Sequence, residues 1–137
     1  EPVKESIKLM HQMNIWVEIT TLIVPSLNDS PEELTELADF IASVGKDIPW
    51  HISRFYPQYK IENLEATPVE TLKMAQAIGK KSGLRHVYLG NVPPEGENTY
   101  CYNCRELLVE RYGFSVLKQK IKDSRCPQCS SVIAGIF

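Results

Sequence analysis

Two cysteine pairs, Cys101-Tyr-Asn-Cys104 and Cys126-Pro-Gln-Cys129, decide the fold of the C-terminal part of this chain and contain all of its cysteines. Two residues between paired cysteines let both thiolates reach one ion, and two such pairs complete a closed tetrahedral site. The 21 residues between Cys104 and Cys126 leave room for a hairpin. The spacing therefore predicts a metal-binding ribbon; four unrelated thiols or two local disulfides are the alternatives.

The predicted metal is zinc, and iron is the other ion that such a four-sulfur cage holds. Zinc bound by four cysteines keeps no open position for water or substrate, so we expect the site to stabilise the fold and not to be catalytic. Reduced, metal-bound cysteines are typical of a reducing compartment. With no bilayer-length apolar stretch and no signal-peptide pattern in the sequence, we expect a cytoplasmic location without membrane contact.

Charge is divided unevenly along the 137 residues, whose net charge is -2. Residues 1–100 carry nine Lys and Arg against fourteen Asp and Glu, whereas residues 101–137 carry six against three. Most of the C-terminal basic residues are close together: Lys118, Lys120, Lys122 and Arg125. A basic ribbon can contact nucleic acid, but a run of this size more often forms a solvated strand face. We therefore do not expect nucleic acid as the partner.

The first 97 residues alternate between helical and extended patterns. Ser30 and Thr67 each place a hydroxyl directly before a proline, with glutamate in the first turn, which predicts two capped helix starts. Gly45 and Gly83 supply the stops. A further helix is predicted from Pro2 to near Asn14. Between the helices lie three segments rich in β-branched and aromatic residues, Ile15–Val24, Trp50–Phe55 and His86–Gly90.

Strands joined by a single helix run parallel, with right-handed crossovers. Three parallel strands leave an edge bare, so we infer that they are the later portion of a larger α/β barrel or open sheet. The predicted fold is therefore α/β, with residues 1–97 as part of an incomplete barrel and residues 98–137 as a small four-cysteine ribbon.

The predicted strands carry polar residues that a strand buried on both faces does not need. Alternation puts Glu18 and Thr20 on one face of the first strand, and His51 and Ser53 on one face of the second. In a barrel interior these residues would form a polar wall suited to a ligand. A hydrogen-bonded core network and a water-facing edge strand are the alternatives.

Ligands of parallel α/β folds gather at the carboxyl ends of strands. Three segments lie there: Pro25–Asp29, Arg54–Pro57 and Gly90–Pro93. Gly90 would let a ligand ring approach the backbone and Asn91 can donate and accept hydrogen bonds, although both are also ordinary turn residues. No Gly-rich phosphate loop, nucleophile elbow or zinc-hydrolase motif occurs, so hydrolase and kinase chemistry find no support.

Three runs carry a family resemblance: Ile15-Trp-Val-Glu-Ile-Thr-Thr-Leu-Ile-Val-Pro-Ser-Leu-Asn-Asp29, Pro49-Trp-His-Ile-Ser-Arg-Phe-Tyr-Pro57 and Gly96-Glu-Asn-Thr-Tyr-Cys-Tyr-Asn-Cys104. They resemble the radical S-adenosylmethionine enzymes of the AmmeMemoRadiSam system, relatives of pyruvate formate-lyase activating enzyme. The resemblance covers only the family's C-terminal portion. It implies that the three strands are the last three of a partial barrel of six strand-helix units.

The resemblance also implies cofactors. Such enzymes use a [4Fe-4S] cluster, held by a CxxxCxxC loop, to pass an electron to S-adenosylmethionine. No CxxxCxxC occurs here, so the cluster and the radical chemistry are implied only for a longer protein, acting on an unidentified substrate, a protein among the candidates. The positions that resemble S-adenosylmethionine contacts are Thr20, Ser53, Tyr56, Gly90 and Asn91. The candidates for facing the substrate are Glu18, His51 and Arg54.

The activating enzymes have an arginine at the place of Glu18 and a histidine at the place of Tyr56, so the family's roles cannot simply be copied to these two side chains. The alternative function is a binding module, in which the basic ribbon recruits a protein or nucleic-acid partner and the strands serve as scaffold.

Overall fold

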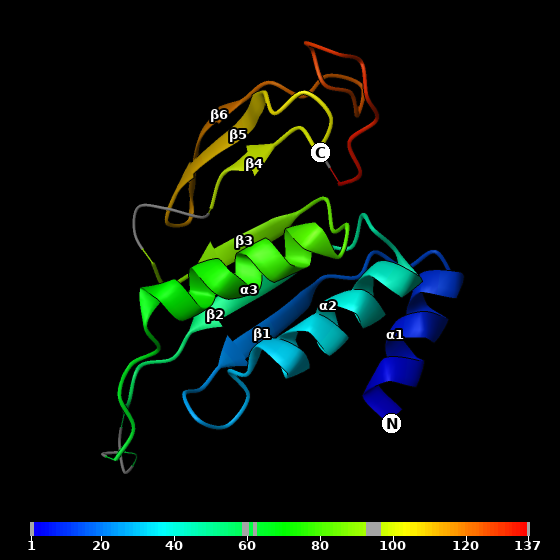
Figure 1. Ribbon diagram of the computed structural model, residues 1–137. Coiled ribbons are helices and arrows are strands. Elements are labelled where there is room, and N and C mark those ends of the chain that lie inside the picture. Colours follow the sequence, from blue (N-terminus) through cyan, green and yellow to red (C-terminus); the bar gives the residue numbers. More distant parts are fainter. Residues whose placement is uncertain (1, 59–60, 62, 93–96, 137) are drawn as a thin grey trace.

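The structure is a computed structural model that describes residues 2–58, 61, 63–92 and 97–136 (Figure 1). Pro93 and Gly96, which belong to segments singled out above, lie outside these residues. The helices and strands are α1 (Pro2–Gln12), β1 (Ile19–Ile23), α2 (Pro31–Val44), β2 (Trp50–Arg54), α3 (Val69–Lys81), β3 (Val87–Gly90), β4 (Thr99–Tyr100), β5 (Leu107–Tyr112) and β6 (Ser115–Gln119).

Strands β1, β2 and β3 form a parallel sheet in that order, which confirms the predicted parallel strands. Ile19 lies opposite Trp50, and Trp50 lies opposite Val87. The first strand was predicted to begin at Ile15, but pairing starts at Ile19 because its partner strand begins only at Trp50. The paired strands are therefore short, with four or five residues each.

Helix α2 begins as the sequence predicts. The Ser30 hydroxyl accepts a hydrogen bond from the Glu33 amide (3.2 Å) and donates one to the Glu33 carboxylate (3.0 Å), while Pro31 occupies the first turn. The hydroxyl thus satisfies the Glu33 amide, one of the amides that the first turn of a helix leaves without a partner, and the carboxylate holds the hydroxyl in place. The helix ends at Val44, directly before Gly45.

The predicted cap of α3 is wrong. Thr67 lies outside the helix, Pro68 takes the cap position and no side chain caps the first turn. The Thr67 side chain is fully buried instead: its hydroxyl donates to the Ile23 carbonyl (2.6 Å) and accepts from the Phe55 amide (3.0 Å). The hydroxyl is used to join the ends of β1 and β2, where two buried backbone groups need partners.

The apolar core lies between one face of the parallel sheet and helices α2 and α3 (Figure 1). Trp50 is fully buried at its centre, and its indole nitrogen donates to the Thr21 hydroxyl (2.9 Å). A Cβ atom at Gly79 would lie 2.9 Å from the Trp50 ring, so this glycine lets α3 approach the sheet closely. The buried members of the core are Ile23, Leu34, Ala38, Ile41, Ile48, Trp50, Ile52, Leu72, Ala75, Leu84, Val87, Leu89 and Val92.

Strands β4, β5 and β6 form a separate antiparallel sheet, which with the cysteine pairs makes up the ribbon, residues 98–136. Figure 1 shows the ribbon beside β3. Its buried residues are Cys101, Leu108, Val109, Ile121, Cys126 and Ile133. None of the helices in the described part of the chain combines the length and apolarity that a bilayer crossing requires.

Candidate metal centre and polar sheet face

The four cysteine sulfurs converge on one point, as the sequence predicts. All four Sγ atoms lie within 4.8 Å of one another, with 3.6 Å between Cys101 and Cys129 and 3.6 Å between Cys104 and Cys126. Zn–S bonds of about 2.3 Å in a tetrahedron place sulfurs about 3.8 Å apart. The four free thiols therefore fit one tetrahedral ion, and the two 3.6 Å contacts join different CxxC motifs.

Each cysteine pair and the turn that follows it form a knuckle, and the same backbone pattern builds both knuckles. The Cys101 amide donates to the Glu106 carbonyl (2.9 Å), and the Arg105 amide donates back to the Cys101 carbonyl (3.0 Å). The second knuckle repeats these bonds: the amide of Cys126 donates to Ser131 (3.0 Å), and that of Ser130 donates to Cys126 (2.9 Å).

This turn requires a left-handed residue four positions after the first cysteine of each pair. Arg105 and Ser130 take that place, with φ angles of 66° and 60°. Two knuckles of equal geometry present their thiols to the common centre. The pattern lies in the backbone, so the spacing of the cysteines did not reveal it.

The environment of the thiols differs between the two knuckles. The hydroxyl and the backbone amide of Ser131 lower the pKa of Cys129 to about 5. The pKa of Cys104 is raised to about 12: the Glu106 amide lowers it, but burial and hydrogen bonds to the other three thiols raise it more. A bound cation would favour the thiolate form of all four, because it replaces the shared protons with positive charge.

The helix-free face of the parallel sheet carries the predicted polar residues. Glu18 and His51 meet, with 2.7 Å between the carboxylate Oε2 and the imidazole Nε2. The Trp16 indole donates to the same carboxylate (2.9 Å), and this bond, together with His51, lowers the pKa of Glu18. Tyr88 stacks on the His51 ring with 5.2 Å between centroids. The alternation of side chains thus brings Glu18 and His51 together.

A cavity of about 590 Å³ lies between this polar face and the ribbon. Glu18, His51 and Tyr88 line its sheet side, while Arg111 and Phe114 line its ribbon side. The Tyr88 hydroxyl shares a 2.8 Å hydrogen bond with Thr99 of β4, which joins the two sides.

A second group of predicted residues lies at the carboxyl ends of β2 and β3. Ser53 is opposite Gly90, where a Cβ atom would come within 3.1 Å of the Ser53 hydroxyl. The Tyr56 hydroxyl donates to the backbone carbonyl of Asn91 (3.1 Å), and the side-chain amide of Asn91 donates to the backbone carbonyl of Arg54 (3.3 Å). Asn91 has a φ of 61°, so it forms a turn as well as a contact.

Two predicted residues do not join the Glu18–His51 pair. Thr20 is exposed on β1, on the same face as Glu18. Arg54 leaves the strand on the opposite face from His51, and its guanidinium donates to the Thr67 carbonyl (2.7 Å) and the Tyr56 hydroxyl (2.9 Å). The structure therefore does not bring Arg54 together with the Glu18–His51 pair.

Sequence reasoning missed three residues around the cavity. Tyr88 follows from alternation, since it lies opposite His51 in the sheet. Arg111 comes from the ribbon and lies 5.9 Å from the Tyr88 ring centroid, a contact between segments that no sequence pattern links. His86 is buried, its Nε2 has no hydrogen-bond partner among the described residues, and burial lowers its pKa.

No family model matches the chain. A search of curated proteins finds similarity to the uncharacterized protein MJ0808 of Methanocaldococcus jannaschii, with 45% identity over 137 residues. The match covers 97% of this chain and 41% of the relative, so the chain spans about two fifths of that protein's length.

Proposed function

We propose that this chain is the C-terminal portion of a radical S-adenosylmethionine enzyme of the activating-enzyme type, with a structural zinc ribbon. The proposal rests chiefly on the parallel sheet, whose helix-free face collects polar side chains from three strands. It draws further support from the three runs that resemble the family and from the greater length of the archaeal relative. A longer protein of that length has room for the strands and the cluster loop that a complete partial barrel needs.

The carboxyl-end residues fit a role in holding S-adenosylmethionine. Gly90 leaves space beside the Ser53 hydroxyl that a Cβ atom would take, and the Tyr56–Asn91 pair presents polar groups at the same edge. With Thr20 on the neighbouring strand, these side chains and the Gly90 backbone would orient the cofactor. When bound and reduced, S-adenosylmethionine supplies the 5'-deoxyadenosyl radical.

The [4Fe-4S] cluster does not fit this chain. Its only cysteines are the four of the ribbon, and their sulfurs already share one centre with the spacing of a single ion. The cluster would therefore have to come from a CxxxCxxC loop elsewhere in a longer protein. The ribbon ion has four sulfur ligands and no open position, so its proposed role is to hold the fold.

Glu18 and His51 are the proposed substrate-facing residues. A carboxylate that orients an imidazole is a common arrangement for moving a proton. His51 bonds Glu18 through Nε2, and its Nδ1 makes no hydrogen bond to another described residue. In the cavity beside the ribbon, His51 could therefore exchange a proton with a bound substrate through Nδ1.

The decisive experiment uses the longer protein. After anaerobic reconstitution with iron and sulfide, we expect cluster absorbance and reductive cleavage of S-adenosylmethionine to 5'-deoxyadenosine. Ser53→Val should weaken cofactor binding, whereas Ser43→Val, an exposed α2 residue, should not. A fully reconstituted protein that neither binds nor cleaves S-adenosylmethionine would refute the proposal.

One observation favours the alternative, a binding module. The hairpin of β5 and β6 exposes four large apolar side chains: Tyr112, Phe114, Val116 and Leu117. An exposed apolar group of this size suits a protein partner better than nucleic acid. If the ribbon only recruits a partner, Val116→Ser combined with Leu117→Ser will abolish binding of that protein partner, and the reconstituted longer protein will not cleave S-adenosylmethionine.

A further inference from the structure

A second hollow, a groove of about 830 Å³, lies on the other side of β3, between α3 and the ribbon. Its walls come from the exposed face of α3, from the start of β3 and from the first knuckle of the ribbon. The groove shares four lining residues with the cavity that contains Glu18 and His51, namely His86, Tyr88, Leu89 and Thr99. None of its lysines and arginines lines that cavity, and these cationic residues have no role in the proposed enzyme function.

The groove is strongly basic. Four cationic side chains line it, Lys73, Lys80, Arg85 and Arg105, and no described aspartate or glutamate does. Asp47, outside the groove, forms an ion pair with Arg85 (3.0 Å). Neither Lys80 nor Arg105 forms an ion pair with a described carboxylate. In a chain of net charge -2, this concentration of positive charge points to an anionic ligand.

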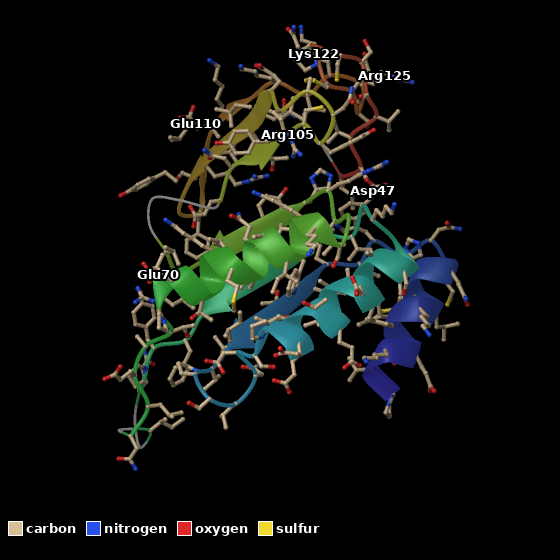
Figure 2. All side chains as sticks on the ribbon, viewed as in Figure 1. Asp47, Glu70, Arg105, Glu110, Lys122 and Arg125 are labelled. Carbon is tan, nitrogen blue, oxygen red and sulfur yellow. The ribbon has the colours of Figure 1, made fainter. Side chains whose placement is uncertain are left out.

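The cations come from positions that the fold determines. Arg105 is the left-handed residue of the first knuckle, so the metal site holds its backbone. Arg85 is held between Asp47 and the ring of Tyr102, 4.0 Å from its guanidinium. Lys80 belongs to the last turn of α3. Figure 2 shows Arg105 on the part of the ribbon nearer the parallel sheet, and Lys122 and Arg125 at its far end.

The groove also offers groups that suit an aromatic base. Tyr100 lines it with nearly half of its surface exposed, 48%, which leaves the ring open for stacking. Asn98 and Gln76 also line it. The Asn98 oxygen already accepts from the Arg111 amide and the Gln76 nitrogen donates to the Val87 carbonyl, so Asn98 offers its NH2 group as a donor and Gln76 its oxygen as an acceptor. The buried His86, whose Nε2 has no partner among the described residues, contributes a further polar group to the wall.

We propose that this groove binds a phosphate ester with an aromatic base, that is, a nucleotide or the phosphorylated end of a nucleic acid. Arg105 and Lys80 bind the phosphate, because charge-assisted hydrogen bonds to phosphate are strong and a guanidinium can form two at once. Tyr100 stacks on the base. S-adenosylmethionine carries no phosphate and has a sulfonium cation, so the groove does not serve that cofactor.

Isothermal titration of the metal-loaded protein with AMP, adenosine and 5'-phosphorylated oligouridine tests the proposal. We expect AMP to bind and adenosine not to bind, with affinity that falls as salt is raised. Stronger binding of the oligonucleotide than of AMP would identify a nucleic-acid end as the natural ligand. Stronger binding of AMP than of the oligonucleotide would identify a free nucleotide. Equal binding of AMP and adenosine, or no binding of any phosphate, would overturn the proposal.

Charge-reversal variants locate the binding. Arg105→Glu and Lys80→Glu should each weaken AMP binding about tenfold, since each removes a charge-assisted contact and adds repulsion. Lys122→Glu makes the same charge change at the far end of the ribbon and should leave binding unchanged. A loss equal in all three variants would show general electrostatic attraction and refute the site. Lys80→Glu keeps the test valid if Arg105→Glu disturbs the knuckle, because α3 is outside the ribbon.

S-adenosylmethionine cleavage by the longer protein separates the two proposals. Cleavage that survives Lys80→Glu, together with lost AMP binding, supports both. AMP binding by a protein that never binds S-adenosylmethionine refutes the enzyme proposal and leaves the groove in place.

Discussion

The parallel sheet and the ribbon contain three strands each, but different interactions hold them together. Among the described residues, the sheet has two covering helices and thirteen buried apolar residues in its core. The ribbon core has six buried residues, two of which are cysteines of the metal centre. Small units bury too little apolar surface to be stable alone and need metals or disulfides. From this comparison we infer that the ribbon depends on an ion bound by its four cysteines and the sheet on its packing.

Metal removal tests this difference most strongly. Cys129→Ser should release the ion and unfold the ribbon, because a structural zinc site contributes about 10 kcal/mol of apparent binding energy. Metal analysis after dialysis and amide NMR spectra check this: signals of residues 98–136 should collapse while those of the parallel sheet persist. Ser131→Ala removes the hydroxyl beside the Cys129 sulfur and should keep the ion. An ordered ribbon without metal would contradict the comparison.

The converse change is made in the sheet core. Trp50→Ala leaves a large cavity and should lower the free energy of unfolding by about 3–5 kcal/mol. Urea unfolding followed by circular dichroism measures this loss, and metal analysis should still find a bound ion. Trp16, which is 38% exposed, gives the matched control: Trp16→Ala should cost far less. Equal costs for the two tryptophans would mean that the core is not centred on Trp50.

The Thr67 hydroxyl carries a smaller share of the stability of the sheet. Thr67→Val leaves the Ile23 carbonyl and the Phe55 amide without their buried partner, at a cost of about 2 kcal/mol. Thr67→Ser keeps the hydroxyl and should recover most of this free energy. If urea unfolding finds valine as stable as serine, the hydroxyl does not join the strand ends.

The contact between the two regions should have the smallest effect. Tyr102→Leu removes the ring beneath the Arg85 guanidinium and should cost about 0.5–1 kcal/mol, without loss of the ion. A double-mutant cycle with Arg85→Met measures the coupling energy between Arg85 and Tyr102 separately from the Arg85–Asp47 ion pair. A coupling energy of zero would show that the ribbon and the sheet are energetically independent at this contact.

Local patterns of the sequence predicted the elements well. Ser30 and Pro31 identify the start of α2, and alternation correctly places Glu18 and His51 on one face. The cysteine spacing predicts the common centre of the four sulfurs. In each case the signal is local, a cap, an alternation or a CxxC spacing, even where the contact that results joins distant segments, as between Glu18 and His51 or between the two cysteine pairs.

The failures arise where a side chain serves a distant segment. Thr67 has the pattern of a helix cap, but two buried backbone groups from other strands compete for its hydroxyl and win. Arg111 and the basic groove depend on how the ribbon lies against β3, which no local pattern encodes. The family resemblance and the roles of Thr20, Ser53 and Tyr56 stay predictions.

The Thr67 contacts also fix the two ends of the segment that connects β2 to α3, so that the sheet does not depend on the length of this segment. Thr67 bonds Phe55 through backbone and side chain, which clamps the base of the segment between β2 and α3. A loop closed at a fixed base pays only about 0.6 kcal/mol for each doubling of its length. This connection is therefore the natural insertion point for an affinity tag or a fluorescent reporter, which would sit beside the carboxyl ends of the strands without displacing them.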